Sequence, residues 1–332
     1  TAVASRLKLM ARLDIGEKRL PQDGRIDYQF GNQHLDMRVS TLPGVHGESV
    51  VLRILDRGDT SVDLQQLGMP KHILNDYQKI VTQPHGMILI TGPTGSGKTT
   101  TLYATLEKIN SEKQKIITVE DPVEYQLEGI TQIQANASIG LSFAAGLRSI
   151  VRQDPDVLMV GEIRDHETAE IAIESALTGH LVFSTLHTND AAGAVTRLQD
   201  MGVEGYLISS SLLAIQAQRL VRRVCPDCSE THELSSDEAT VLEISQEICP
   251  SIKRGSGCER CGNTGYRGRV GLYELLLMSD AIRHHIATGA DVNVIREQAI
   301  SEGMETLRQD ALAKLQAGLT TPEEVVRVTR AL

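Results

Sequence analysis

The sequence predicts an α/β protein in which a mainly parallel β-sheet is covered by helices on both faces. Two observations support this fold class. Short apolar runs alternate with helical segments between Gly68 and about Val224, and a glycine-rich loop stands between one of these runs and the helix that follows it. Because parallel strands must be joined by long crossovers, such alternation is typical of a parallel sheet. The chain of 332 residues is also long enough for more than one structural unit.

The elements of the central unit, residues 68–224, follow from the period of the hydrophobic residues. The expected strands are Met87–Thr91, Ile116–Glu120, Val157–Val160 and Leu181–Leu186. The expected helices are Lys98–Asn110, Phe143–Arg152, Glu167–Leu177, Ala191–Met201 and Tyr206–Arg222.

Residues 1–58 predict a small α+β unit before the central one. We expect a helix at Ala4–Asp14 and then a meander of three strands. The strands are Arg25–Phe30, His34–Leu42 and Glu48–Leu55, separated by Gly31-Asn32 and Pro43-Gly44. Residues 59–67 are expected to form a linker.

Two further segments follow the central unit. Residues 225–268 form a cysteine-bearing insert, and residues 269–332 are expected to be a helical subdomain. Ser279, Asp291 and Thr321 are expected helix starts, the last with proline at the first helical position.

The composition is that of an ordinary globular protein, with 41% hydrophobic and 23% charged residues. A formal net charge of −10, 3% aromatic residues and the absence of tryptophan disfavour a broad nucleic-acid surface. No apolar run approaches the ~18 residues of a membrane span, and no secretory signal is evident. Because the chain starts at Thr1 and enters an expected helix at once, we expect a fragment that lacks an upstream segment.

The glycine-rich loop is the most specific motif. Gly92-Pro-Thr-Gly-Ser-Gly-Lys98-Thr99 matches the phosphate-binding pattern G-x-x-x-x-G-K-[ST], in which backbone N–H groups and a helix N-terminus surround phosphates. Lys98 can reach the β- and γ-phosphates of ATP, and the Thr99 hydroxyl can hold Mg²⁺. The expected nucleotide ligands are Gly92, Pro93, Thr94, Gly95, Ser96, Gly97, Lys98, Thr99 and Thr100. A glycine-rich turn without function is the disfavoured alternative.

Acidic and histidine side chains follow the other strands of the expected sheet. Glu162 comes after Val157–Val160, with Gly161 where aspartate is usual. Glu120 and Glu124 lie at the end of the preceding strand, and His187 follows the next. Ligands bind at the carboxyl ends of parallel strands, so these groups could hold Mg²⁺, orient water or sense the γ-phosphate. Surface carboxylates and a structural histidine are the plainer alternatives.

Phosphoryl transfer also needs positive charge on the γ-phosphate. Six arginines at strand or helix edges are candidates: Arg38, Arg53, Arg148, Arg152, Arg164 and Arg197. Most surface arginines form only weak salt bridges, and the pattern alone does not choose among them.

Four cysteines form two C-x-x-C pairs, Cys225/Cys228 and Cys258/Cys261. Two such pairs can give four thiolates to one structural Zn²⁺. Two disulfides are the alternative, disfavoured for a nucleotide enzyme of the cytosol. His232 and Cys249 are spare candidates, and Cys249 is the odd thiol.

With these motifs together, nearly the whole chain resembles the secretion ATPase superfamily, most closely the type II secretion motors of the general secretion pathway E family. Gly92–Thr99 is similar to their Walker A motif and Ile117–Tyr125 to their Asp box. Leu147–Asp165 is similar to their Walker B region, including glycine in place of aspartate, and Gly179–Asn189 to their His box. The segment Arg12–Arg25 is similar to the one before the family's meander.

The resemblance implies a RecA-like, hexameric, cytoplasmic ATPase that is docked at the inner membrane of a Gram-negative cell and powers pseudopilus assembly. It implies Glu162 as the Walker B acid, Glu120 and Glu124 as Asp-box acids and His187 as the His-box residue. Arg38 and Arg53 would reach the nucleotide from the amino-terminal unit, and the other four arginines from the motor domain.

The implied partners are copies of the chain itself, the cytoplasmic domain of secretion protein L through the missing upstream region, and the platform protein F. No nucleic acid and no membrane span are expected. The type IV pilus assembly ATPases are an alternative, since they share the boxes and the cysteine pairs. Retraction ATPases match less well because that branch generally lacks the cysteine insert. A nucleic-acid motor and a non-catalytic nucleotide-gated scaffold are the rivals from other classes.

Overall fold

The structure is a computed structural model that describes residues 2–31, 33–56, 63–245, 247 and 249–329. The chain divides into two compact units, Thr1–Ser61 and Val62–Leu332. Each is described by itself below. No helix among the described residues is both long enough and apolar enough to cross a membrane.

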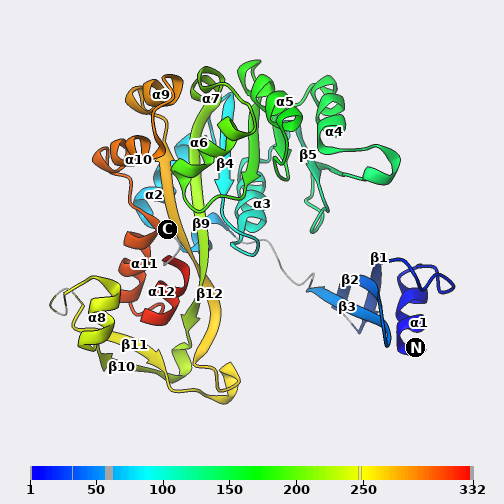
Figure 1. The fold of residues 1–332 in the computed structure, drawn as a ribbon, viewed down its shortest axis with the longest axis horizontal. Helices are drawn as coiled ribbons and strands as arrows, with labels where there is room; N and C mark the ends of the chain where they lie inside the picture. Colours follow the sequence, from blue (N-terminus) through cyan, green and yellow to red (C-terminus); the bar gives the residue numbers. More distant parts are fainter. Residues whose placement is uncertain (1, 32, 57–62, 246, 248, 330–332) are drawn as a thin grey trace. The chain divides into compact units, whose positions relative to one another are not determined.

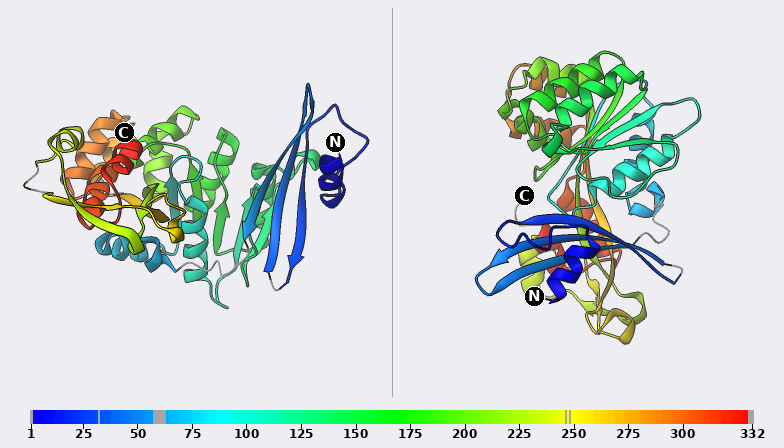
Figure 2. Two further views of the ribbon diagram at one scale, coloured as in Figure 1. Left: turned by 90° about the horizontal axis from the view of Figure 1, so that it is seen from below. Right: turned by 90° about the vertical axis from the view of Figure 1, so that its right-hand side faces the viewer.

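The first unit is the expected helix and meander. Helix α1 (Ala2–Met10) packs against the antiparallel strands β1 (Gln22–Phe30), β2 (Gln33–Gly44) and β3 (Gly47–Asp56) (Figure 2). A small core of Ala11, Ile26 and Val39 lies on one face of this sheet. The prediction of a three-stranded meander is confirmed, with Gly44 paired to Gly47 across a two-residue turn.

The second unit is built on a seven-stranded sheet with the order β12-β9-β4-β8-β7-β5-β6. All neighbouring pairs are parallel except β12 and β9. The strands are β4 (Gly86–Thr91), β5 (Ile116–Glu120), β6 (Thr131–Gln134), β7 (Val157–Val160), β8 (Leu181–Leu186), β9 (Leu212–Val224) and β12 (Tyr266–Leu277). The four strands predicted in this unit are all present, and three of them have the predicted bounds.

Helices cover both faces of this sheet, as predicted (Figure 1). Met87 and Leu89 of β4 belong to one core, together with the helices α4 (Phe143–Ile150), α5 (His166–Leu177), α6 (Ala191–Asp200) and α7 (Gly205–Ser211). Ile88 and Ile90, which point the other way, belong to a second core with α2 (Lys71–Ile80) and α3 (Lys98–Ile109). Strands buried on both faces are mostly apolar along their length, and this explains why the sequence predicts them.

Two predictions of helix in this unit are wrong. The helix expected at Tyr206–Arg222 ends at Ser211, and Leu212–Val224 is the strand β9, which lies beside β4. The segment expected to be helical from Arg269 begins with β12, which pairs with β9. In β9 the buried side chains include Gln216 and Gln218, so the run does not look like a buried strand. Pairing on both edges overrides the helical propensity of its leucine, alanine and glutamine residues.

The long hairpin of β9 and β12 carries the cysteine-bearing insert at its far end (Figure 1). The insert contains β10 (Ser229–Glu233), α8 (Ser236–Leu242) and β11 (Ser251–Gly255). After β12 come α9 (Asp280–Ala287), α10 (Val292–Ser301), α11 (Leu307–Gln316) and α12 (Pro322–Thr329). Ser279 and Asp291 cap α9 and α10, as expected.

Short 3₁₀ turns complete the fold: η1 (Leu64–Leu67), η2 (Ala137–Ile139), η3 (Val151–Gln153), η4 (Pro226–Cys228) and η5 (Glu259–Cys261). The first part of the expected linker, residues 59–62, lies outside the described residues. Its later part, η1, belongs to the second unit, because Leu64 is buried there and Tyr273 donates a hydrogen bond to the Leu67 carbonyl at 3.0 Å.

Candidate functional site

The glycine-rich loop joins β4 to α3 at the carboxyl edge of the sheet. Gly97 caps α3 with a left-handed φ of +89°, and Lys98 is the first residue of the helix. A Cβ on Gly92 would lie 2.3 Å from the Gln218 carbonyl oxygen, and one on Gly97 would lie 2.8 Å from Nε2 of Gln218. At Gly92 the backbone of β9 therefore requires glycine, while at Gly97 the left-handed φ favours glycine and an added Cβ would meet the end of the Gln218 side chain.

Lys98 lies folded over this loop. Its Nζ donates to the carbonyl oxygens of Gly92, at 2.7 Å, and Pro93, at 3.2 Å. Burial lowers the pKa of Lys98 to about 8, while Glu162 acts to raise it and Arg219 to lower it. Inside the loop, Ser96 Oγ is buried without a hydrogen-bond partner. Thr99 and Thr100 are half-buried in the first turn of α3.

Glu162 and His187, after the adjacent strands β7 and β8, face one another. His187 Nε2 lies 3.1 Å from Glu162 Oε2, and Arg164 forms an ion pair with the same carboxylate. Together with Arg197 of α6, these residues line a cavity of about 390 Å³. The structure thus brings four of the predicted site residues into one place.

Glu120 has a different environment. It ends β5 with only 4% of its surface exposed, and it accepts hydrogen bonds from Tyr103, from Thr118 at 2.6 Å and from Gln132 at 3.2 Å. Burial raises its pKa, although these hydrogen bonds oppose the change. Glu120 is therefore packed against α3, while Glu124 is half-buried and its backbone N–H donates to Tyr103.

The other predicted arginines are distributed over both units. Arg148 of α4 pairs with Glu167, and the exposed Arg152 donates to the Arg148 carbonyl oxygen. In the first unit, Arg38 is the direct cross-strand partner of Arg53 and also of Arg25. These three lie in a row on the sheet face opposite the small core. Arg25 was not predicted; only the strand register reveals it.

Arg219 of β9 is a second residue that the sequence did not single out. It is 8% exposed, and its Nη2 donates to the carbonyl and side-chain oxygens of Asn189, two residues after His187. Its Nε is buried without a hydrogen-bond partner. Burial lowers the pKa of Arg219, while Asp190 and Glu274 act to raise it. The sequence pattern does not point to this arginine, because it lies within the segment Tyr206–Arg222 that was expected to be a helix.

The loop after β8 is held from several sides. Thr188 and Thr91 are joined through their hydroxyls at 2.6 Å, and Asp190 pairs with Arg296 of α10. Arg219 holds Asn189 between these two contacts. The segment that contains His187 is consequently tied to the strand that leads into the phosphate loop.

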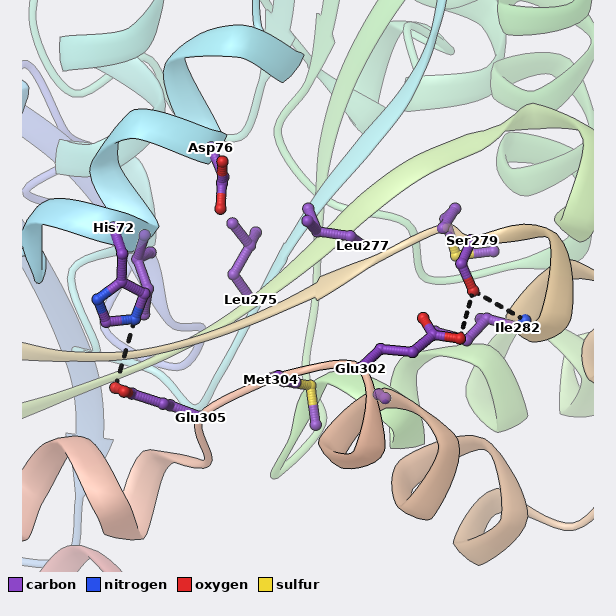
Figure 3. Close-up of a pocket in the computed structure, with 13 residues that line it drawn as sticks. His72, Asp76, Leu275, Leu277, Ser279, Ile282, Glu302, Met304 and Glu305 are labelled. Carbon is purple, nitrogen blue, oxygen red and sulfur yellow. Dashed lines mark hydrogen bonds and ion pairs between the residues drawn. The ribbon is translucent and has the colours of Figure 1, made fainter.

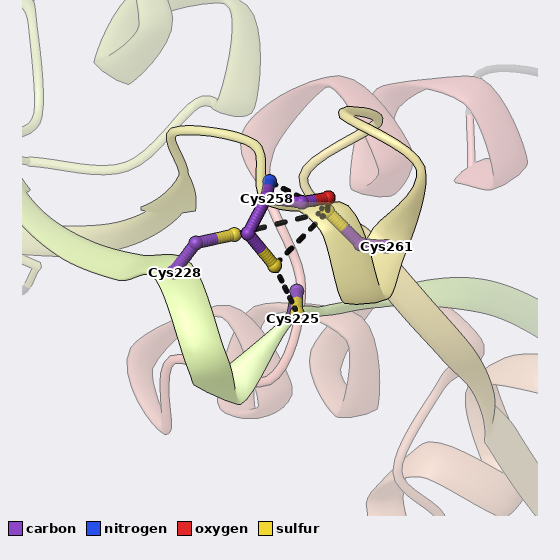
Figure 4. Close-up of side chains that lie close together, drawn as sticks. All are labelled: Cys225, Cys228, Cys258 and Cys261. Atoms are coloured by element: carbon purple, nitrogen blue, oxygen red, sulfur yellow. Dashed lines mark hydrogen bonds between the residues drawn. The ribbon is translucent and has the colours of Figure 1, made fainter.

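The four cysteines of the insert come together (Figure 4). Their sulfur atoms lie within 4.8 Å of one another, at 3.9 Å for Cys225 and Cys258, 3.9 Å for Cys228 and Cys261, and 3.7 Å for Cys258 and Cys261. Four sulfurs at about 2.3 Å from one tetrahedral Zn²⁺ would be about 3.8 Å apart, so this donor set fits zinc.

The sulfur of Cys261 also accepts hydrogen bonds from the backbone N–H groups of Cys258 and Gly265. Such hydrogen bonds are typical of the tight turns that hold zinc-binding thiolates. All five cysteines are free thiols rather than disulfides. Cys249 is buried and donates to the Ser251 carbonyl oxygen, and His232 is exposed on β10. Among the described residues, neither of the two spare candidates belongs to the cluster.

The parallel sheet, the glycine loop at its carboxyl edge and the carboxylate after β7 define the class of P-loop α/β proteins. A family model described as "Type II/IV secretion system protein" matches residues 1–327. The chain belongs to this family.

Similar proteins agree with this assignment. The chain is 52% identical over 328 residues to the type II secretion system ATPase E of Vibrio cholerae serotype O1 and to the type II secretion system protein E of Pseudomonas aeruginosa. Each match covers 99% of this chain and 65% of the relative, so the chain spans about two thirds of their length. The resemblance seen in the motifs is thereby confirmed.

Solved structures share the fold. The pilus retraction motor PilT, solved with bound ADP, is 28% identical with a TM-score of 0.68, covering 98% of this chain and 81% of that one. The ATPase DotB of Legionella pneumophila has a TM-score of 0.69 at 22% identity, covering 94% and 78%.

Proposed function

We propose that this chain is the motor portion of a type II secretion ATPase, which hydrolyses ATP to power pseudopilus assembly and protein secretion across the outer membrane. The observation that carries the proposal is the arrangement of Glu162, His187, Arg164 and Arg197 around one cavity, at the edge of the sheet that holds Lys98. The 52% identity to curated type II secretion proteins supports the same activity.

Lys98 and the loop from Gly92 to Gly97 would hold the phosphates. The lysine would exchange its two carbonyl partners for the β- and γ-phosphate oxygens, which favour its charged form. Thr99, in the first turn of α3, would hold Mg²⁺, which would neutralise phosphate charge. Bound ADP in the 28%-identical PilT structure supports a nucleotide ligand.

Glu162 would orient and polarise the attacking water, because it is the carboxylate that faces the cavity. His187, at 3.1 Å, would hold the position of this carboxylate and sense the γ-phosphate. Arg164 and Arg197 would stabilise negative charge that develops on the phosphoryl group.

The remaining predicted residues would act less directly. Glu120 would brace α3 through Tyr103, since its carboxylate is packed in the interior. Arg38 and Arg53 would contribute positive charge from the first unit to the nucleotide's phosphates, as would Arg148 and Arg152 from α4. Four thiolates of the cysteine cluster would leave Zn²⁺ no open ligand position, so its role would be structural.

The working assembly would be a hexamer of the full-length protein, docked at the inner membrane of a Gram-negative cell on secretion protein L and platform protein F. The curated relatives are named as type II secretion proteins. Their names support the proposal that this chain acts in the same pathway and with these partners.

The deciding experiment compares wild type with Lys98→Ala and Glu162→Gln, in phosphate release and in binding of a fluorescent ATP analogue with Mg²⁺. We expect Lys98→Ala to lose both activities and Glu162→Gln to bind nucleotide without turning it over. If Glu162→Gln hydrolysed ATP at the wild-type rate, the chain would be a nucleotide-gated scaffold or would use another acid. Stimulation of turnover by DNA or RNA at physiological salt would instead favour a nucleic-acid motor.

A further inference from the structure

A second cavity lies in the same unit, and none of its lining residues belongs to the candidate ATP site. Its volume is about 320 Å³, and three separate segments build it (Figure 3). These are α2, the end of β12 with the start of α9, and the end of α10 with the turn that leads to α11.

The floor of this cavity is apolar and forms part of the folded core. Ile73 of α2, Leu275 of β12 and Ile282 of α9 are buried and line it, together with Ala299 and Met304. Leu277 differs from them because its side chain is 40% exposed. The buried lining residues are fixed by their packing in the core. The cavity is therefore already formed in the folded chain.

The rim of the cavity is acidic. Asp76, Glu302 and Glu305 line it, and none of the thirteen lining residues is lysine or arginine. Glu305 lies 3.4 Å from His72, and Glu302 accepts hydrogen bonds from Ser279 at 3.0 Å and from Gln298 at 2.7 Å (Figure 3). Asp76 pairs with Lys79, which stands outside the lining. Beside the apolar hollow there remain Glu302 and Glu305, the latter next to the His72 ring.

We propose that this cavity binds one apolar side chain of a partner protein other than this chain, from a segment in which lysine or arginine flanks the apolar residue. The apolar anchor would fill the hollow, and the cations would meet Glu302 and Glu305 at the rim. A buried anchor surrounded by polar contacts is the arrangement that concentrates binding energy in protein interfaces.

Two properties of the cavity select this occupant. Its acidic rim repels nucleotides and other polyanions, so it is no second phosphate site. Its volume is at the low end of the range for small-molecule pockets, roughly 300–1,000 Å³, and suits an anchor side chain.

The probe for this proposal is a short helix-forming peptide with one leucine flanked by lysines, together with a matched peptide in which glutamate replaces every lysine. Both are titrated against the whole chain and followed by fluorescence anisotropy. We expect saturable binding of the lysine peptide, weaker at high salt, and no binding of the glutamate peptide.

Two variants test whether the peptide is bound in this cavity. Leu277→Lys places a cation at its mouth, and the double variant Glu302→Gln, Glu305→Gln removes the acidic rim. Each is expected to weaken binding of the lysine peptide about tenfold or more. The matched controls are Leu177→Lys, where the leucine is 42% exposed, and Glu170→Gln, Glu174→Gln on the exposed side of α5. These should bind the peptide as wild type does.

The proposal is overturned if wild type shows no saturable binding, if the glutamate peptide binds equally well, or if the controls lose as much affinity as the cavity variants. Sedimentation equilibrium of wild type and Leu277→Lys adds one further outcome. A change of oligomeric state in Leu277→Lys would show that a second copy of this chain occupies the cavity, which also overturns the proposal. ATP turnover is measured in parallel and is expected to be unchanged, so the outcome is independent of the ATPase assignment.

Discussion

Arg219 of β9 donates hydrogen bonds to both oxygens of Asn189, at 3.2 Å to the carbonyl and 3.0 Å to the side chain. Asn189 lies two residues after His187. The positive charge of Arg219 also acts to lower the pKa of Lys98. One buried guanidinium is thus coupled to the phosphate loop and to the loop after β8.

Replacing Arg219 should change the site in two separable ways. Arg219→Met removes a neighbouring cation, so the pKa of Lys98 should rise, and it also frees Asn189, so turnover should fall several-fold. Arg219→Lys keeps the charge and loses the double hydrogen bond, and it should lower turnover while leaving the pH dependence of ATP binding near that of wild type. Affinity and turnover measured across pH for both variants check this. Identical pH profiles in Arg219→Met and wild type would contradict the electrostatic part.

ATP affinity should decline at alkaline pH. Burial lowers the pKa of Lys98 to about 8, and phosphate oxygens favour the charged amine. The lysine is fully protonated well below this pKa and loses its charge as the pH rises through about 8, so affinity should be highest below that value. Equilibrium binding measured on both sides of pH 8 tests the prediction. In Lys98→Arg the guanidinium keeps its charge, and any remaining ATP binding should lose this dependence.

Glu162→Gln should lower turnover by about a hundredfold or more while nucleotide binding persists, because the amide cannot act as a base. His187→Gln should have a smaller effect, since the glutamine can still donate a hydrogen bond to Glu162. Single-turnover phosphate release with saturating ATP and Mg²⁺ measures both variants. An equal loss in the two would show that His187 itself takes part in the chemistry.

Loss of zinc should destabilise the insert. Metal analysis of the purified chain is expected to find about one zinc per chain. Cys258→Ser removes one of four thiolates, and both this change and a chelator should lower the melting temperature by several degrees. Cys249→Ser is the control, because Cys249 is buried outside the cluster. A chelator with no effect on the melting temperature of wild type would argue against a structural metal.

Two glycines of the phosphate loop should tolerate alanine differently. Gly95 and Gly97 both have left-handed φ angles, +79° and +89°, so alanine costs about 1 kcal/mol or more at either position. Only at Gly97 would the added Cβ also press on Gln218, at 2.8 Å; at Gly95 it meets open space. Urea unfolding should therefore show a larger loss of stability for Gly97→Ala than for Gly95→Ala.

The sequence predicted best those elements whose burial is uniform. The strands β5, β7 and β8 were predicted with their observed bounds, because all their residues are buried and most of them are apolar or β-branched. The strand β9 was missed because Gln216, Gln218 and Arg219 interrupt its apolar run. Whether such a segment is a strand depends on β4 and β12, which are distant in the sequence.

The site residues that could be predicted are likewise those that depend on predicted strands. Glu162 and His187 could be predicted because each follows a predicted parallel strand, and the carboxyl ends of such strands share one edge. The pairing of Arg25 with Arg38 depends on strand register, and the place of Arg219 depends on the missed strand. Neither relationship is visible in local sequence.

Strand β9 touches the phosphate loop through Gln218 and, a few residues later, leads directly into Cys225. β4 pairs with Leu212–Ala217 of this strand, and from Gln218 onward the sheet pairing of the strand is with β12. A shift of the loop that accompanies a change of nucleotide would therefore be passed toward the cysteine cluster along the hairpin of β9 and β12.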